Sequence, residues 1–271
     1  MSTPISASTP RVLPALPSLP EQAENLIELG IPALVGLNPV QVRAIATTNP
    51  AQQAPPATAG SSTSPEPGAP AAAAAAANSP AASHAPTAPG APALPRQEND
   101  ALPPLLVLPG APIQSLAPLM VREGKPGFVV EDMTDVEEFI PIDGLDVPAQ
   151  PYLLHGIDRG DALRNASPEE AQAQFTSDGR TALTLAEGIY WVLAQPEALA
   201  PNYCFMTIAS RRPKARGGLD ARTPALWISG GTGRDGKPRR GAAKVGWCWA
   251  RNRHTWLGFA SAAARTPVPA C

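Results

Sequence analysis

Cysteine and histidine are scarce in this chain, and neither follows a ligand or disulfide pattern. The 271 residues contain three cysteines, Cys204, Cys248 and Cys271, and three histidines. Structural zinc sites usually need closely spaced ligand pairs, and no C-x-x-C or H-x-x-x-H spacing occurs. Only Cys204, Cys248 and His254 remain as weak metal candidates, so we expect no metal and no cofactor. An odd cysteine count without framework spacing suits a reducing compartment, which predicts a cytoplasmic protein.

Long apolar runs are missing as well. No stretch of 18 apolar residues occurs, which is about the least that crosses a bilayer as a helix. Residues 1–20 also lack the basic start and the unbroken apolar core of a secretory leader. We therefore expect no membrane partner.

Large hydrophobic residues are nearly absent between residues 51 and 100. This stretch holds 18 Ala and 10 Pro, and Leu94 is its one large hydrophobe. Such a composition buries too little apolar surface to offset an ordering cost of roughly 1–2 kcal/mol per residue. We expect residues 49–101 to be a disordered Ala/Pro-rich linker.

The linker divides the chain into unequal parts. We expect a disordered tail over residues 1–17, a helical hairpin over 18–48, a main domain over 102–266 and a frayed tail over 267–271. Because two helices of about ten residues are too small to be stable alone, the hairpin must dock on something. It either returns to the main domain or associates with a protein partner or a second copy.

The main domain combines helix and strand signals. Apolar segments bounded by Gly and Pro predict strands, and Ser or Thr placed three residues before Glu predicts helix starts. The predicted helix starts are Ser18 with Glu21, Thr134 with Glu137, Ser167 with Glu170, and Thr184 with Glu187. The fold class is therefore α+β, with helices on one face of a mostly antiparallel sheet.

The net charge of -2 conceals two regions of opposite sign. Residues 123–170 carry 12 Asp or Glu against three Lys or Arg, and residues 210–253 carry 12 Lys or Arg against two Asp. The two regions either face each other in one domain, or the basic one, with Arg239 and Arg240, meets an anionic partner.

Residues 246–258 read GWCWARNRHTWLG and concentrate the reactive side chains. If residues 244–250 and 254–261 form a hairpin with a three-residue loop, Cys248 and His254 share one face. Cys248 would then be a nucleophile with His254 as its base, and Arg251 and Arg253 would steer an anionic substrate. The alternative is that Cys248 only fills a tight position in the core.

Two binding hypotheses compete with this enzyme. The first is a non-catalytic protein-interaction module with a tethered N-terminal helical pair. The second is single-stranded nucleic acid bound by basic loops and stacked indoles, for which stacking contributes roughly 1–3 kcal/mol per base. The residues concerned in this second hypothesis are Trp247, Trp249, Trp256, Arg239, Arg240, Arg251 and Arg253.

Several motifs resemble one family. The segments GRTALTLAEGIYWVLAQPEAL, CFMTIASR, PALWIS and KVGWCWARNRHTWLG, with GKPGFV near the start of the main domain, are similar to uncharacterised proteins of high-GC bacteria that share a domain of unknown function. The signature is G-W-C-W-x-x-N-x-H-T-W-L-G. The resemblance implies no reaction, cofactor or partner, and the basic loops at 210–222 and 230–243 are longer here than in the family pattern.

Overall fold

The computed structural model describes residues 13–47 and 102–268. The predicted linker lies outside these residues. At the C-terminal end the ordered chain extends slightly beyond the predicted boundary, because Pro267 ends a strand and Val268 is buried. At the N-terminal end the backbone carbonyl of Pro14 accepts a hydrogen bond of 2.6 Å from the side chain of Gln195. Pro14, which was predicted to lie in a disordered tail, thus contacts the main domain, and so does Val268, whose backbone amide donates to the carbonyl of Pro151 at 2.8 Å.

The N-terminal unit has one more helix than the predicted hairpin. Its helices are α1 (Leu19–Glu28), α2 (Ile31–Leu34) and α3 (Pro39–Thr47). Ser18 and Glu21 form the predicted capping box at the start of α1. Gly30 adopts a positive φ of 71°, a conformation that glycine adopts without strain and that ends α1. The chain therefore turns into α2 before it reaches α3.

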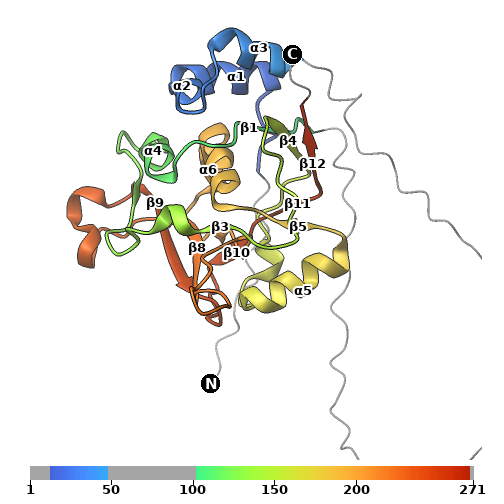
Figure 1. Ribbon diagram of the computed structural model, residues 1–271. Coiled ribbons are helices and arrows are strands. Elements are labelled where there is room, and N and C mark those ends of the chain that lie inside the picture. Colours follow the sequence, from blue (N-terminus) through green and yellow to red (C-terminus); the bar gives the residue numbers. More distant parts are fainter. Residues whose placement is uncertain (1–12, 48–101, 269–271) are drawn as a thin grey trace, which may run out of the picture.

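Gln22 fixes this unit to the main domain. Its side-chain amide donates to the backbone carbonyl of Pro104, and its side-chain oxygen accepts from the backbone amide of Leu106, both at 2.8 Å. Leu106 belongs to β1 (Leu105–Val107), an edge strand of its sheet, so Gln22 bonds the edge as a neighbouring strand would. Asn25 adds a bond of 3.0 Å to the carbonyl of Leu193. Of the two predicted alternatives, the structure shows the return to the main domain (Figure 1).

Within the described residues the strands form four sheets, mostly antiparallel, in agreement with the predicted α+β class. A three-stranded sheet has the order β1, β4 (Tyr152–His155) and β12 (Ala264–Pro267). A five-stranded sheet has the order β10 (Leu257–Phe259), β6 (Cys204–Met206), β8 (Arg222–Ile228), β9 (Ala243–Trp249) and β2 (Phe128–Val129). The two small sheets pair β11 (Ser261–Ala262) with β5 (Thr181–Ala182), and β3 (Ile140–Pro141) with β7 (Ser210–Arg211).

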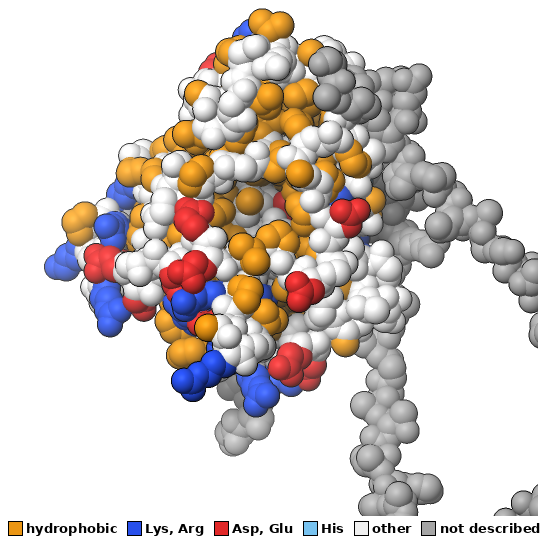
Figure 2. Space-filling view, viewed as in Figure 1, with side chains coloured by type: hydrophobic (Ala, Val, Ile, Leu, Met, Phe, Trp, Pro, Cys, Tyr) orange, Lys and Arg blue, Asp and Glu red, His pale blue; other side chains and the backbone are white. Residues whose placement is uncertain are grey.

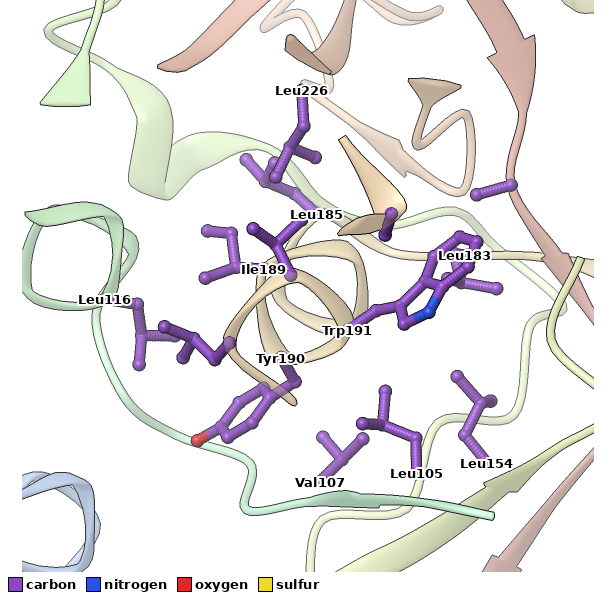
Figure 3. Close-up of a cluster of buried hydrophobic side chains, with 14 of the residues drawn as sticks. Leu105, Val107, Leu116, Leu154, Leu183, Leu185, Ile189, Tyr190, Trp191 and Leu226 are labelled. Atoms are coloured by element: carbon purple, nitrogen blue, oxygen red, sulfur yellow. The ribbon is translucent and has the colours of Figure 1, made fainter. Parts of the chain in front are cut away.

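Helix α6 (Leu185–Ala194) lies between the two larger sheets. Figure 3 shows its side chains meeting Leu226 of β8 on one side and Leu105 of β1 on the other. Gly188 makes the close approach possible, because a Cβ there would lie 2.6 Å from Cγ2 of Thr207. The core is therefore built around one helix that contacts both sheets.

A buried ion pair joins α6 to the last strand. Glu187 and Arg265 have side chains 0% and 5% exposed, and Nε of Arg265 lies 2.6 Å from the Glu187 carboxylate. The hydroxyl of Tyr152 donates to the same carboxylate at 2.8 Å, and the backbone amide of Thr184 donates at 2.7 Å. Both carboxylate oxygens of Glu187 accept hydrogen bonds, so we assign a structural role to the pair of Glu187 and Arg265.

Two further α-helices belong to the main domain. Helix α4 (Ile113–Leu116) follows β1, and α5 (Pro168–Asp178) begins at the predicted capping box of Ser167 and Glu170. The 3-10 turns are η3 (Ala117–Leu119), η4 (Val136–Glu138), η5 (Asp161–Leu163), η6 (Pro196–Ala198), η7 (Gly233–Asp235) and η8 (Lys237–Arg239).

One predicted helix start was wrong. Glu137 does not pair with Thr134; its carboxylate instead accepts from the backbone amides of Ile113 and Gln114, at 3.1 and 2.9 Å. It therefore caps α4, a helix that lies before it in the sequence.

Candidate functional site

The predicted hairpin within GWCWARNRHTWLG does not form. Strand β9 pairs with β8 and β2, and β10 pairs in parallel with β6. Because β8 is antiparallel to both β6 and β9, strands β9 and β10 run in the same direction. Strands β6 and β8 separate them, so at about 4.8 Å per strand their backbones lie about 14 Å apart. The backbone amide of Asn252 donates to the carbonyl of Trp249 at 3.0 Å, so a turn follows β9, and residues 253–256 then lead back along the sheet to β10.

This topology gives Cys248 and His254 different surroundings. Cys248 lies opposite Thr223 near the C-terminal end of β9. His254 precedes β10 in the connecting segment, and its ring centroid lies 5.5 Å from that of Trp256. The Nε2 atom of His254 is buried and has no hydrogen-bond partner among the residues of the described segments. The prediction of a hairpin that places Cys248 and His254 on one face was therefore wrong.

The pKa shifts of both groups disfavour a preformed thiolate–imidazolium pair. Burial raises the pKa of the Cys248 thiol to about 11, although Lys244 has a smaller opposing effect. Burial lowers the pKa of His254. A thiol with a raised pKa holds little thiolate near neutral pH, so the arrangement lends no support to nucleophilic catalysis by Cys248.

The weak metal candidates do not come together. Cys204 lies on β6 with its thiol 3.6 Å from the carbonyl of Ala200, and burial raises its pKa to about 11. Within residues 13–47 and 102–268, no three His, Cys, Asp or Glu side chains lie where they could hold a metal ion.

The two charged regions face each other. Arg222 donates to both carboxylate oxygens of Asp135, at 3.0 and 2.6 Å, and this lowers the pKa of Asp135. Further pairs across the two regions are Arg212 with Asp135 and Glu138, Arg234 with Asp132, Arg239 with Glu131, Arg251 with Glu169, and Arg253 with Glu170. Figure 2 shows Lys and Arg side chains at the left and lower edges of the molecule, with Asp and Glu among them.

This pairing weakens the case for nucleic acid. A phosphate backbone needs a surface of net positive charge, and the carboxylates of residues 123–170 compensate much of the basic region. Arg239, one of the predicted binding residues, pairs with Glu131 at 3.5 Å and lies over the ring of Phe128. Arg240 is exposed, and its backbone carbonyl accepts from the ammonium group of Lys125. Nucleic-acid binding stays an untested prediction.

The tryptophans occupy both faces of the β8–β9 ribbon. Trp247 and Trp249 share the face that carries Leu226, and their ring centroids lie 4.7 Å apart. Trp227 lies on the opposite face, where its ring centroid is 6.1 Å from that of Trp256. Trp247 and Trp256 are half-buried, whereas Trp249 is 49% exposed. Only Trp249 thus presents a large open surface.

A groove of about 610 Å³ lies beside this exposed indole. We call it the Trp249 groove, and it is lined by Glu169, Arg211, Leu219, Asp220, Ala221, Trp249, Ala250 and Arg251. Leu219 is 43% exposed. Arg251 and Glu169 form a loose ion pair of 3.8 Å with side chains 89% and 71% exposed. The groove therefore offers apolar surface between exposed charged groups.

Arg211 is the unusual member of this groove. One terminal nitrogen donates to the backbone carbonyl of Asp220 at 2.6 Å, while its Nε is buried and has no hydrogen-bond partner within the described segments. No carboxylate of those segments lies within 4.0 Å of it. Burial lowers the pKa of Arg211, although Asp220 and Glu169 oppose this. Asp220 and Glu169 are thus near enough to act on Arg211 electrostatically, but neither forms a direct ion pair with it, and a guanidinium in this state can bind an anionic group.

A second pocket, of about 410 Å³, lies at the other end of the ribbon. Its walls include Trp227, Trp247, Lys244, Asp235, Arg234 and Asp132, and we call it the Trp227 pocket. The sequence analysis included Trp247 but missed Trp227 and Lys244. Their one signal was that Trp227 lies within the PALWIS motif and that Lys244 begins the predicted strand 244–250, and only the strand register places them opposite each other.

These features define an α+β protein with two aromatic-lined hollows on one ribbon, and no helix in the described segments is both long and apolar enough to cross a membrane. The chain belongs to the family of unknown function DUF5701, whose model matches residues 25–268. Comparison with curated proteins and with solved structures gives no match. The family match covers the N-terminal unit from within α1 and the whole main domain.

Proposed function

We propose that this chain is a cytoplasmic, non-catalytic protein-interaction module whose binding surface is the Trp249 groove. The observation that carries the proposal is the placement of a 49% exposed indole beside a guanidinium that has no carboxylate partner within the described segments. Exposed Trp and incompletely paired Arg are the residues that contribute most to protein interfaces. The raised pKa of the Cys248 thiol, about 11, supports this reading over the alternative of a cysteine-dependent enzyme.

The groove favours a partner of defined chemistry. Its apolar surface comes from Trp249 and Leu219, and its positive charge without a direct ion pair comes from the Arg211 guanidinium. A carboxylate that bonds Arg211, next to an aliphatic or aromatic side chain that lies on Trp249, would satisfy both. We therefore infer that the partner presents an acidic residue adjacent to an apolar one.

The N-terminal unit supports the main domain in this proposal. The polar side chains of α1 bond to β1 and α6, and Leu26 and Ala23 are buried. Its exposed apolar residues are Leu34 and Val40. Association of residues 18–48 with a partner or a second copy remains a separate, untested prediction.

Peptide selection tests the groove directly. A library of short acidic peptides is selected on the full-length protein, and the enriched peptides are titrated against Trp249→Ala and Arg211→Gln. The control is Arg253→Gln, which changes an exposed residue outside the groove lining. We expect enrichment of Asp or Glu beside apolar residues and a loss of affinity of about tenfold or more in both groove variants. Equal affinity of the peptides for all the proteins would refute the proposal.

A further inference from the structure

The Trp227 pocket has a rigid floor. Nζ of Lys244 lies 2.6 Å from the carboxylate of Asp235, both side chains are 12% exposed, and Ser229 donates to the same carboxylate at 2.7 Å. Lys244 also lies 4.8 Å from the centre of the Trp227 ring. Although burial opposes it, the hydrogen bond from Lys244 helps hold the pKa of Asp235 below its usual value. The floor is thus a satisfied, ionised pair that has no need of a ligand.

Gly246 sets the position of the aromatic wall. A Cβ at this residue would lie 2.5 Å from Cη2 of Trp227, so the indole rests directly on the glycine backbone. Trp256 meets the same indole edge to face. The ring is therefore held by Gly246, Lys244 and Trp256, and presents a fixed surface to the pocket.

The charged groups at the mouth are held much more weakly. Arg234 and Asp132 form a pair of 3.3 Å with side chains 73% and 42% exposed. Glu131, which also lines the pocket, lies 3.5 Å from Arg239 and is similarly exposed. Exposed pairs of this kind contribute little to stability, so a ligand can replace either partner at small cost.

The mouth therefore offers one cation and two anions above an indole wall. A ligand with only a negative charge would meet Arg234 but also face Asp132 and Glu131, and a ligand with only a positive charge would leave Arg234 without a partner. A zwitterion satisfies both signs at once. A volume of about 410 Å³ is within the range of small-molecule sites.

We propose that the Trp227 pocket binds a small zwitterion of the amino-acid type. Its carboxylate bonds Arg234, its ammonium group bonds Asp132, and an apolar side chain lies against the indole wall. This site is separate from the Trp249 groove and shares no lining residue with it, so either proposal can fail without the other.

The test uses the full-length protein and three matched probes in calorimetric titrations. L-phenylalanine carries both charges, 3-phenylpropionate lacks the ammonium group, and phenethylamine lacks the carboxylate. We expect phenylalanine to bind at least about tenfold more tightly than either analogue, because each analogue loses one charged hydrogen bond. Equal binding of all three probes, or no binding of phenylalanine at millimolar concentration, would overturn the proposal.

Substitutions of exposed residues then test which protein side chain binds the carboxylate and which binds the ammonium group of the ligand. We expect Arg234→Gln to weaken phenylalanine but not phenethylamine, and Asp132→Asn to weaken phenylalanine but not 3-phenylpropionate. Arg251→Gln, in the other hollow, is the control and should leave all three affinities unchanged. Gly246→Ala should abolish binding by displacing Trp227, and a melting curve shows whether that variant is folded. If Arg234→Gln or Asp132→Asn lost binding of both analogues, the assignment of one ligand charge to each side chain would be contradicted.

Discussion

The side chain of Gln22 and the backbone amide of Leu106 are separated by 84 positions in the chain and joined by a hydrogen bond of 2.8 Å. Gln22 is 2% exposed, so this bond is shielded from water. One side chain thereby joins a segment that precedes the predicted linker to the first strand that follows it.

Replacing Gln22 by Leu should destabilise the whole protein. The change keeps the volume but leaves the buried amide of Leu106 and the carbonyl of Pro104 without this partner, which costs about 1–3 kcal/mol for each unsatisfied group. Urea unfolding followed by tryptophan fluorescence measures the effect. Glu24→Gln, which alters an exposed pair with Arg43, is the control and should change little. An equal effect of the two variants would show that Gln22 is not a structural link.

Breaking the buried pair of Glu187 and Arg265 should be more severe. Arg265→Met leaves a fully buried carboxylate without its cation, and such changes typically cost about 3–5 kcal/mol. The double variant Glu187→Gln with Arg265→Met removes both charges, and we expect it to recover part of the loss. Denaturation curves of the three proteins test this. A single variant as stable as the parent would contradict the assigned role.

Acid should weaken the link between Arg222 and its carboxylates. Arg222 lowers the pKa values of Asp135 and Asp220 below their usual 3.8. The stabilisation that these two ionised carboxylates provide is complete above pH 3.8. It is lost as the pH falls further, because the carboxyl groups of the unfolded chain take up protons before those of the folded protein. The difference in unfolding free energy between the parent and Arg222→Met should therefore shrink below pH 3.8.

Urea unfolding over a pH series measures that difference. Arg216→Gln, a change of an exposed arginine, should follow the parent at every pH. If the difference in unfolding free energy between the parent and Arg222→Met were the same in acid as at neutral pH, the ion pairs of Arg222 would not be its cause.

Cys248 should react slowly with alkylating reagents. With its pKa raised to about 11, the thiol is almost fully protonated at neutral pH, and its rate should rise about tenfold per pH unit toward that value. Mass spectrometry of the Cys248 peptide after iodoacetamide treatment measures the rate. His254→Gln should leave the rate unchanged. Fast labelling at pH 6 that disappears in this variant would restore the catalytic pair.

Local patterns in the sequence predicted local structure well. Ser18, Ser167 and Thr184 each begin a helix with the Glu three residues later, because both halves of a capping box lie within one turn. Thr134 has the same spacing, yet Glu137 caps α4 instead. The same carboxylate can serve either helix start, and only tertiary packing decides between them.

The prediction of the candidate site was wrong because it depended on which strands pair in the sheet. Residues 244–250 and 254–261 were expected to pair because they are close in sequence and both apolar. The structure pairs β10 with β6 in parallel, an arrangement that short-range alternation does not reveal. The sequence did show the opposite charges of residues 123–170 and 210–253. That the two regions face each other was one of the two expected outcomes. The Trp227 pocket depends on the register of β8 and β9, so it could not be predicted.

The attachment of α1 to β1 has a consequence for how the gene can change. Helix α3 packs on α1, and Gln22 of α1 bonds β1, so the described chain on either side of residues 48–101 belongs to one small subassembly. Doubling the length of a closed loop costs only about 0.6 kcal/mol. Insertions and deletions in this interval should therefore be nearly neutral for folding, which leaves its length free to drift between related chains.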